Sequence, residues 1–193
     1  LLGENGAGKT TLMNILFGYY ACDAGEIFIK GEKVNLTAPK DAISRGVGMI
    51  HQHFALVPSQ TVLENVIVGT ASRRGIFLDL QSARQALVEL QDRFGLQIDP
   101  DARVWTLSVG EQQKVEIIKA LYRDVDILIM DEPTAVLAPA ETADLFNTLR
   151  SLVKEGRSVV FISHKLNEVM DISDRIVVLR AGEVVAERKT SET

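Results

Sequence analysis

The chain has 193 residues, of which 46% are hydrophobic and 24% charged, and these values are close to those of ordinary globular domains. Its net charge of −5 argues against a nucleic-acid partner, because phosphate backbones are usually bound by a basic face. The single cysteine, Cys22, cannot form an internal disulfide, and no apolar run approaches the roughly 20 residues of a membrane span, so we expect a cytosolic protein whose membrane contacts are made through a partner.

The first part of the sequence predicts helices and strands in alternation, which indicates an α/β fold. A glycine-rich loop that begins at Gly3 leads into a helix that we expect to end at Gly18. Further on, the sequence predicts a β-hairpin over residues 26–34, a short helix over residues 39–45 and a buried strand over residues 47–50.

Residues 61–122 are predicted to be mostly helical and to form a subdomain inserted into the α/β core. Capping boxes, in which a Ser or Thr and a Glu three residues later bind each other's backbone amides, are indicated at Thr61 and Ser108. Another helix between them is expected to end at Gly95. Its predicted apolar face consists of Leu87, Val88, Leu90 and Phe94.

The α/β core is predicted to resume after the helical segment. The expected elements are a strand over residues 126–130, a helix over 139–154, a strand over 158–162, a short helix over 165–170, and two strands over 175–179 and 183–187. The last two strands are joined by a turn at Ala181–Gly182.

The segment from Gly3 to Thr10 matches the phosphate-binding pattern G-x-x-x-x-G-K-[ST]. Glycines let backbone amides turn inward around anionic oxygens, and the following helix adds its positive N-terminal dipole. Lys9 is expected to reach the β and γ phosphates of a nucleotide, and the hydroxyl of Thr10 to bind Mg²⁺. The nucleotide-binding residues predicted in this segment are Gly3, Asn5, Gly6, Gly8, Lys9, Thr10 and Thr11.

An apolar strand is followed by two carboxylates, Asp131 and Glu132. Taken alone this pattern is common, and a helix N-cap often explains it. Beside a phosphate-binding loop, however, such a strand end is where nucleotide-hydrolysing proteins hold Mg²⁺. We therefore expect Asp131 to bind the metal and Glu132, one residue further, to polarise the attacking water.

Three further segments carry weaker signals. Residues 107–113 open a helix, and a plain N-cap explains them as well as a function does, although Ser108 and the amides around Gly110 would also suit a γ-phosphate. Gln52 and His164 each follow a predicted strand, at the end of the sheet where α/β proteins place ligands. By themselves, such residues are usually only solvated.

Taken in order, these five motifs resemble the ATP-binding cassette family over nearly the whole chain, residues 1–193. The resemblance implies a P-loop NTPase with a RecA-like α/β core, an antiparallel β-subdomain and the inserted helical subdomain at about residues 61–122. It also implies that two cassettes enclose two ATP molecules, each held between the phosphate-binding loop of one cassette and the signature helix of the other.

The resemblance also assigns roles by position. Glu132 is implied to be the general base, His164 a contact to the γ-phosphate, and Gln52 a residue that senses Mg²⁺ and the transmembrane subunit. The implied cofactors are ATP and Mg²⁺, and the implied metal site consists of Thr10, Gln52 and Asp131. The signature residues implied to bind nucleotide are Ser108, Gly110 and Glu111.

The exact residues within these motifs resemble those of the importers of simple sugars and nucleosides. The signature carries Val109 and Glu111 where the common form is LSGGQ, and Ala138 stands where many cassettes have an Asp, which puts the usual contact across the cassette dimer in doubt there. In such importers one polypeptide carries two tandem cassettes, and this chain resembles the first. An exporter motor and a soluble cassette ATPase that does not transport are the alternatives.

The implied partners are transmembrane permease subunits, a second cassette and, indirectly, a solute-binding protein, at the cytoplasmic face of the cell membrane. Residues 52–69 are expected to dock the permease, with plain core packing as the alternative for their apolar side chains. Only Leu1 and Leu2 precede the loop, so we expect an N-terminally truncated chain that lacks the family's adenine-stacking aromatic residue and binds ATP more weakly than its parent.

Overall fold

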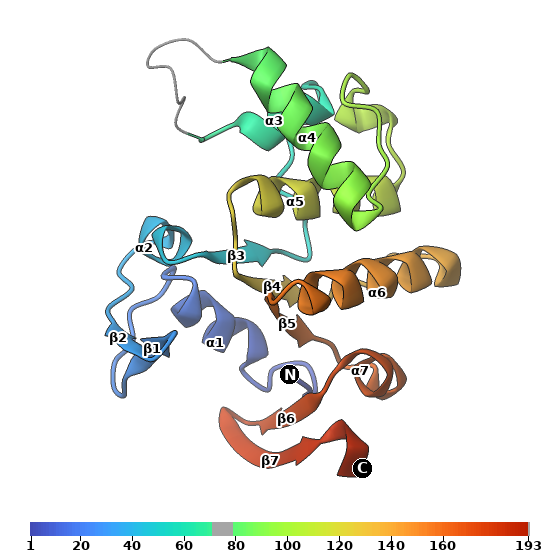
Figure 1. The fold of residues 1–193 in the computed structure, drawn as a ribbon. Coiled ribbons are helices and arrows are strands. Elements are labelled where there is room, and N and C mark those ends of the chain that lie inside the picture. Colours follow the sequence, from blue (N-terminus) through green and yellow to red (C-terminus); the bar gives the residue numbers. More distant parts are fainter. Residues whose placement is uncertain (71–78, 193) are drawn as a thin grey trace. The chain divides into compact units, whose positions relative to one another are not determined.

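The computed structural model describes residues 1–70 and 79–192, which form two compact units. The core unit comprises residues 1–52, 126–133 and 157–193, and the helical unit comprises residues 53–125 and 134–156. Figure 1 labels their helices and strands. No helix within the described residues combines the length and the apolar character that crossing a membrane requires.

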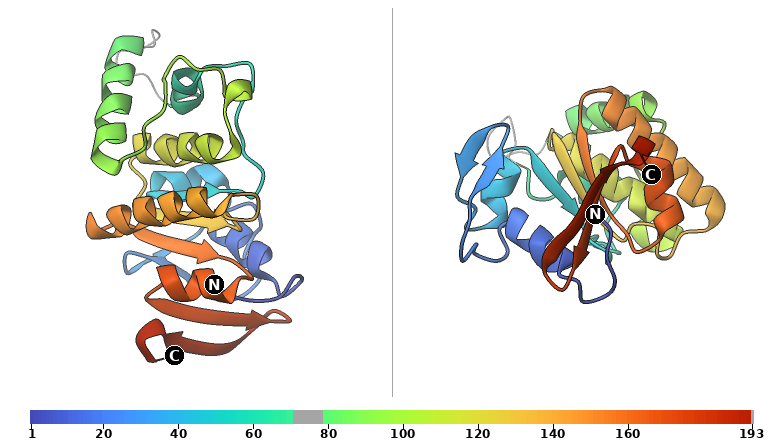
Figure 2. Two further views of the ribbon diagram at one scale, coloured as in Figure 1. Left: turned by 90° about the vertical axis from the view of Figure 1, so that its right-hand side faces the viewer. Right: turned by 90° about the horizontal axis from the view of Figure 1, so that it is seen from below.

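The core unit is built on a parallel sheet with the strand order β3-β4-β5 (Figure 1). These strands are β3 (Val47–Ile50), β4 (Ile127–Asp131) and β5 (Ser158–Ile162). Their near-continuous apolar sequences are typical of parallel strands that are covered on both faces. Leu2 forms parallel bridges to Ser163 and to Val178, so the start of the chain lies between the end of β5 and the next strand, as Figure 2 also shows.

Two antiparallel hairpins complete the strands of the core unit. They pair β1 (Ile27–Ile29) with β2 (Glu32–Val34), and β6 (Arg175–Arg180) with β7 (Glu183–Lys189). Both turns have positive φ at each central residue, 52° and 81° at Lys30–Gly31 and 49° and 82° at Ala181–Gly182. Two such residues in succession match the twist of the paired strands, and they confirm both predicted hairpins.

Three helices belong to the core unit: α1 (Lys9–Leu16), α2 (Pro39–Ser44) and α7 (Leu166–Ile172), together with a 3₁₀ turn, η2 (Thr190–Glu192). The helix predicted to end at Gly18 stops two residues earlier, with Phe17 as its C-cap. Met13 and Phe17 from the end of α1 pack with Ile129 and Ile162 from the central strands in the main apolar cluster. The buried faces of α1 and of the sheet thus form one core.

The helical unit contains α3 (Val62–Ile67), α4 (Leu80–Phe94), a 3₁₀ turn η1 (Val104–Thr106), α5 (Val109–Tyr122) and α6 (Pro139–Lys154). Both predicted capping boxes are confirmed, with the side chains of Thr61 and Ser108 accepting from the amides of Glu64 and Glu111. The helix predicted over residues 139–154 is confirmed as α6, and Leu145, Leu149 and Leu152 lie on its buried face.

The predicted apolar face of α4 is confirmed at Leu87 and Phe94 but wrong at Val88. Val88 in α4 is 40% exposed, whereas the buried residues of this helix are Ala83, Leu87, Gln91 and Phe94. Val88 follows Leu87 directly and is therefore turned about 100° away from it around the helix axis. Gln91 takes the buried position because its side-chain amide donates to the carbonyl of Ile98.

Candidate nucleotide-binding site

The loop between Leu2 and α1 has a backbone that only glycine adopts readily at two of its positions. Gly6 and Gly8 have φ angles of 81° and 96°, and Gly8 is the N-cap of α1. Gly3 is close to β6, where an added Cβ would lie 2.5 Å from the carbonyl oxygen of Leu179. The amides at the start of α1 are therefore held at the carboxyl end of the parallel sheet, where they can bind an anion.

Lys9 is the first residue of α1, and its side chain, which reaches back to the loop, is only 7% exposed as a residue. Its ammonium donates to the carbonyls of Gly3 at 2.7 Å and Glu4 at 3.1 Å, and among the described residues no carboxylate forms an ion pair with it. A buried ammonium with only neutral partners is costly. A bound phosphate would supply the missing counter-charge, so the loop fits the nucleotide predicted for it.

Thr10 and Asp131 meet across the core unit. The hydroxyl of Thr10 donates to Oδ2 of Asp131 at 3.0 Å, and Asp131, the last residue of β4, is 7% exposed. A hydroxyl and a carboxylate are hard oxygen ligands of the kind that Mg²⁺ takes in small numbers beside phosphate and water. The pair therefore fits the predicted metal, and it also ties α1 to the central strand.

Glu132 follows Asp131 in an unusual backbone conformation, with φ at 49°. Its amide donates to the carbonyl of Ile162 at 3.0 Å, which holds this conformation against the neighbouring strand. Left-handed φ at a residue other than glycine costs about 1–3 kcal/mol and concentrates at functional sites. The conformation directs the side chain of Glu132 toward His164 rather than continuing the strand.

His164 is the partner of that carboxylate. Its Nδ1 lies 3.0 Å from both Oε1 and Oε2 of Glu132, whose side chain is 12% exposed, while the side chain of His164 is 51% exposed. An Nδ1–H group that donates to the carboxylate leaves Nε2 as an acceptor toward solvent or ligand. The structure thus brings together the two residues that the sequence predicts to be catalytic.

Gln52 lies two residues beyond the end of β3, on the same edge of the sheet as Glu132, because β3 and β4 are parallel. Its side chain is exposed, as are those of Asn5 and Thr11. Beside it, the ring of His51 packs against Phe17 and Tyr19, and the hydroxyl of Tyr19 is 3.4 Å from Nε2 of His51. This aromatic cluster was not predicted from the sequence.

A pocket of about 760 Å³ extends along the first half of the loop. Besides Glu4, Asn5 and His164 it is lined by Arg180 and by Val185 from the β6–β7 hairpin. The hairpin approaches through a hydrogen bond from the amide of Gly182 to the carbonyl of Ala7 at 3.0 Å. Sequence reasoning missed Arg180, because no local pattern signals that a distant hairpin lies beside the loop.

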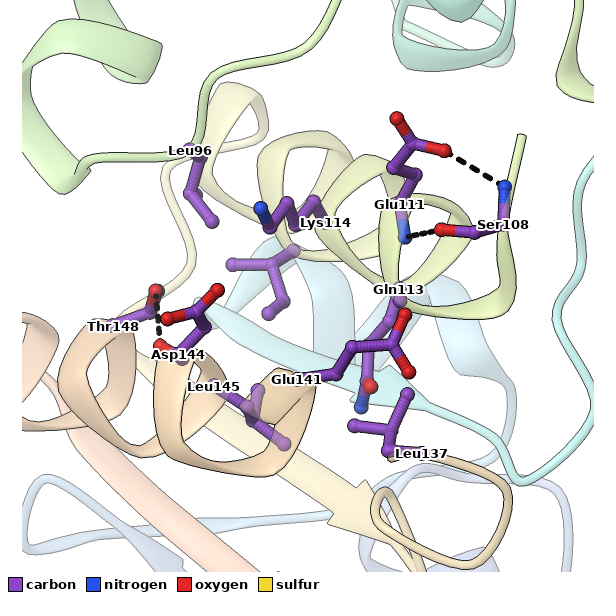
Figure 3. Close-up of a pocket in the computed structure, with 12 residues that line it drawn as sticks. Leu96, Ser108, Glu111, Gln113, Lys114, Leu137, Glu141, Asp144, Leu145 and Thr148 are labelled. Carbon is purple, nitrogen blue, oxygen red and sulfur yellow. Dashed lines mark hydrogen bonds between the residues drawn. The ribbon is translucent and has the colours of Figure 1, made fainter. Parts of the chain in front are cut away.

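The signature residues lie in the helical unit, at the start of α5. Oγ of Ser108 accepts from the amide of Glu111 at 3.3 Å, and the carboxylate of Glu111 accepts from the amide of Ser108 at 2.8 Å. Gly110 is buried against Glu141 of α6, whose side chain would have to shift to admit a Cβ at that position. Figure 3 shows the side chains of Ser108, Glu111 and Glu141 around the start of α5. Within this unit, therefore, the side chains of Ser108 and Glu111 are already engaged in capping their own helix.

A phosphate-binding loop at the end of a parallel sheet, with a buried lysine and a threonine–aspartate pair, defines a P-loop NTPase. The chain belongs to the ABC transporter family, because the model of that family matches residues 1–135. This match confirms the resemblance stated from the motifs, and the α/β fold expected from it is confirmed by solved cassettes.

Among curated relatives, the chain is 51% identical to the nucleoside import ATP-binding protein NupA of Lactococcus lactis subsp. cremoris, over 96% of this chain and 37% of NupA. It is 48% identical to the glucose import ATP-binding protein TsgD13 of Haloferax volcanii, over 100% of this chain and 40% of TsgD13. The chain thus spans about two fifths of the length of these relatives.

Among solved structures, the chain is 27% identical to MJ1267, an ATP-binding cassette of an ABC transporter, in its ADP conformation. The TM-score is 0.86, and the match covers 99% of this chain and 79% of MJ1267. It is also 27% identical to the cassette MJ0796 in a dimeric post-hydrolysis state bound to ADP and Pi, with a TM-score of 0.80 over 98% of this chain and 83% of MJ0796.

Proposed function

We propose that this chain is an ATP-binding and ATP-hydrolysing cassette of an importer for a nucleoside or a sugar. The observation that carries the proposal is the buried ammonium of Lys9, which lacks a counter-charge among the described residues of the loop. The names of the relatives NupA and TsgD13 support import, and they favour nucleosides and sugars as the solute class.

Different residues of the chain would bind the phosphates and the Mg²⁺ of the nucleotide. The loop amides and Lys9 hold the phosphates, and Thr10 and Asp131 hold Mg²⁺, with Gln52 as a further ligand from the end of β3. When bound, Mg²⁺ neutralises charge on the β and γ phosphates. Thr10 and Asp131 are already 3.0 Å apart in the structure, so little rearrangement is needed to place them around the metal.

Glu132 and His164 serve the hydrolysis step. The carboxylate of Glu132 accepts a proton from the attacking water, and His164 fixes that carboxylate through Nδ1. A contact from His164 to the γ-phosphate requires Nε2 to carry a hydrogen as well, because phosphate oxygens only accept. The left-handed backbone at Glu132 holds this pair in place before nucleotide arrives. Pre-organisation of this kind lowers the barrier because the polar groups need not reorient during the reaction.

We propose a second cassette and a membrane permease as partners, at the cytoplasmic face of the membrane. Ser108, Gly110 and Glu111 would bind the nucleotide held by the second cassette, and the dimeric state of MJ0796 supports this arrangement. A solute-binding protein would act through the permease.

The permease is proposed to dock on residues 52–69, of which residues 53–69 belong to the helical unit. Val57 and Val68 are 41% and 44% exposed, and the backbone of Pro58 accepts a hydrogen bond from Trp105, which is 60% exposed. Val62, by contrast, is fully buried and belongs to the core of the unit. The exposed apolar side chains of Val57 and Val68 on this segment, and of Trp105 bonded to it, favour a protein partner there.

A hydrogen bond from Lys119 connects α5 to this segment. Burial lowers the pKa of Lys119, whose ammonium donates to the carbonyl of Ala55 at 3.0 Å. Asn65, 2% exposed, bonds both backbone groups of Val57, which gives the segment a defined shape. A pre-shaped surface of this kind is what a specific docking site requires.

The test replaces Glu132 by Gln in the native transport system and measures uptake of labelled guanosine, ribose and glucose by whole cells. We expect uptake of one solute class to fall to background, while the exposed variant Glu183→Gln on β7 transports normally. Normal uptake of all three solutes by Glu132→Gln, with the variant protein present at wild-type levels, would contradict the import function.

A further inference from the structure

A cavity of about 290 Å³ lies in the helical unit between α5 and α6 (Figure 3). Four apolar side chains contribute to its walls: Leu96, Ile117, Leu137 and Leu145. The polar groups that face it come from the same two helices, namely Gln113 and Lys114 of α5 and Glu141 and Asp144 of α6. The signature residues Ser108, Gly110 and Glu111 also line it, whereas Gln113, Lys114, Glu141 and Asp144 have no part in the proposed nucleotide chemistry.

Gln113 is the unusual member of this set. It is 2% exposed, yet neither Oε1 nor Nε2 of its side chain has a hydrogen-bond partner. Figure 3 shows its amide pointing from α5 toward Leu137 and Glu141. Leaving a buried donor and acceptor unpaired costs about 1–3 kcal/mol for each group, so the amide requires a partner that the described residues do not provide.

The charges around the cavity are unbalanced. Glu111, Glu141 and Asp144 contribute three negative charges and Lys114 one positive charge, while the starts of α5 and α6 add roughly half a positive charge each. The carboxylates of Glu111 and Glu141 already cap these helix starts, through the amides of Ser108 and Ala138. Among the described residues, the carboxylate of Asp144 has no hydrogen bond or ion pair, and the remaining surplus is about one negative charge.

We infer that this cavity binds a small organic cation, a protonated primary amine that also carries a hydroxyl group on a short apolar chain. The ammonium would lie between the carboxylate of Asp144 and Oε1 of Gln113, and the hydroxyl oxygen would accept from Nε2 of Gln113. The methylene groups would contact the leucine and isoleucine walls.

The chemistry of the walls excludes other ligand classes. Beside Asp144 an anion would meet the surplus negative charge, and a purely apolar molecule would leave the amide of Gln113 unpaired. Within residues 1–70 and 79–192, no group of three or more His, Cys, Asp or Glu side chains is able to hold a metal ion. A monovalent amine matches both the charge and the unpaired amide.

The order in which a ligand would meet these side chains follows from how exposed each of them is. Asp144 is exposed at the rim and Glu141 is half-buried, whereas Gln113 is buried at the base. An amine would therefore meet Asp144 first and Gln113 last. Because the ligand touches the first turns of α5, next to Ser108 and Gly110, occupancy is expected to stiffen the signature helix, but binding itself requires no nucleotide.

The test measures binding of 4-amino-1-butanol to the whole chain by ligand-observed NMR, without nucleotide and near neutral pH. We expect saturable binding in the millimolar range, and at least about tenfold weaker binding of 1,4-butanediol, which has the same length but no charge. Asp144→Asn and Gln113→Met should each weaken binding of the amine about tenfold or more. The matched control is Asp92→Asn on the exposed face of α4, which should bind like wild type.

Three outcomes would overturn the inference. Absence of saturable binding would mean that water alone satisfies Gln113, and equal binding of the amine and the diol would mean that the cavity does not select charge. Unchanged affinity in the folded Asp144→Asn variant would place the amine elsewhere. Folding is checked by circular dichroism, and ATP binding of the same samples is measured separately, so that failure of the cation site and failure of the proposed nucleotide site are distinguishable.

Discussion

The core unit and the helical unit differ in how their buried polar side chains are satisfied. In the core unit, Lys9 and Asp131 are each 7% exposed and each has hydrogen-bond partners inside the unit. In the helical unit, buried atoms of Gln60, Gln113, Glu116 and Arg123 have none, and among the described residues all such unpaired side-chain atoms lie in this unit.

This difference indicates two kinds of site. The polar groups of the core unit bond one another in the arrangement that a ligand will use, so the site is organised in advance and its ligand is defined by one missing counter-charge. The helical unit keeps some buried side-chain atoms unpaired among the described residues, and at Gln113 the proposed ligand would supply the partners.

The largest effect is expected from Lys9→Ala in the core unit. Removing the buried ammonium should weaken ATP binding by about 3–5 kcal/mol, more than roughly a hundredfold, because it is the only side-chain cation of the loop. Isothermal titration against wild type measures the loss. Lys40→Ala on α2, an exposed lysine in the same unit, is the control and should bind normally.

A somewhat smaller effect is expected from Asp131→Asn. The amide keeps a hydrogen bond with Thr10 but loses the charge that would hold Mg²⁺, so the Mg²⁺ concentration required for ATP binding should rise about 30- to 150-fold, equivalent to about 2–3 kcal/mol. A Mg²⁺ titration at fixed ATP measures the shift. Asp126→Asn removes a partly exposed carboxylate that pairs with Lys30 just before the same strand, and a similar shift there would show that the effect is not specific to Asp131.

The smallest effects, on the free energy of unfolding, are expected from replacing one glycine of each unit by alanine. Gly18 of the core unit has φ of 82°, and an added Cβ would lie 2.6 Å from the carbonyl oxygen of Ala38, whereas Gly95 of the helical unit has φ of 67° with nothing within 4 Å. Gly18→Ala should lower the free energy of unfolding by about 2 kcal/mol or more, and Gly95→Ala by about 1 kcal/mol. Urea unfolding measures both, and an equal loss would show that the backbone conformation alone sets the cost.

Local chemistry made much of the fold predictable. The turns at Lys30–Gly31 and Ala181–Gly182, the caps at Thr61 and Ser108, and the stop at Gly95 each depend on a few neighbouring residues, and all were expected. The phosphate-binding loop was equally visible, because its pattern is contiguous in the sequence.

What the sequence did not reveal depends on long-range packing. The exposure of Val88 and the burial of Gln91 are decided by what α4 meets and by the distant carbonyl of Ile98. Arg180 comes beside the loop only because its hairpin folds back onto Ala7. The pairing of Glu132 with His164 joins residues 32 positions apart, and only the family resemblance suggested that they act together.

The most direct test of the nucleotide site measures ATP binding and ATP turnover on the same preparation of Glu132→Gln. The structure separates the groups that hold phosphate and Mg²⁺ from the Glu132–His164 pair, so binding should stay within about threefold of wild type while the turnover number falls about 10²- to 10⁴-fold. Size-exclusion chromatography with ATP should then show a trapped dimer. Turnover close to wild type in the folded variant would contradict the account, because it would remove Glu132 from the hydrolysis step.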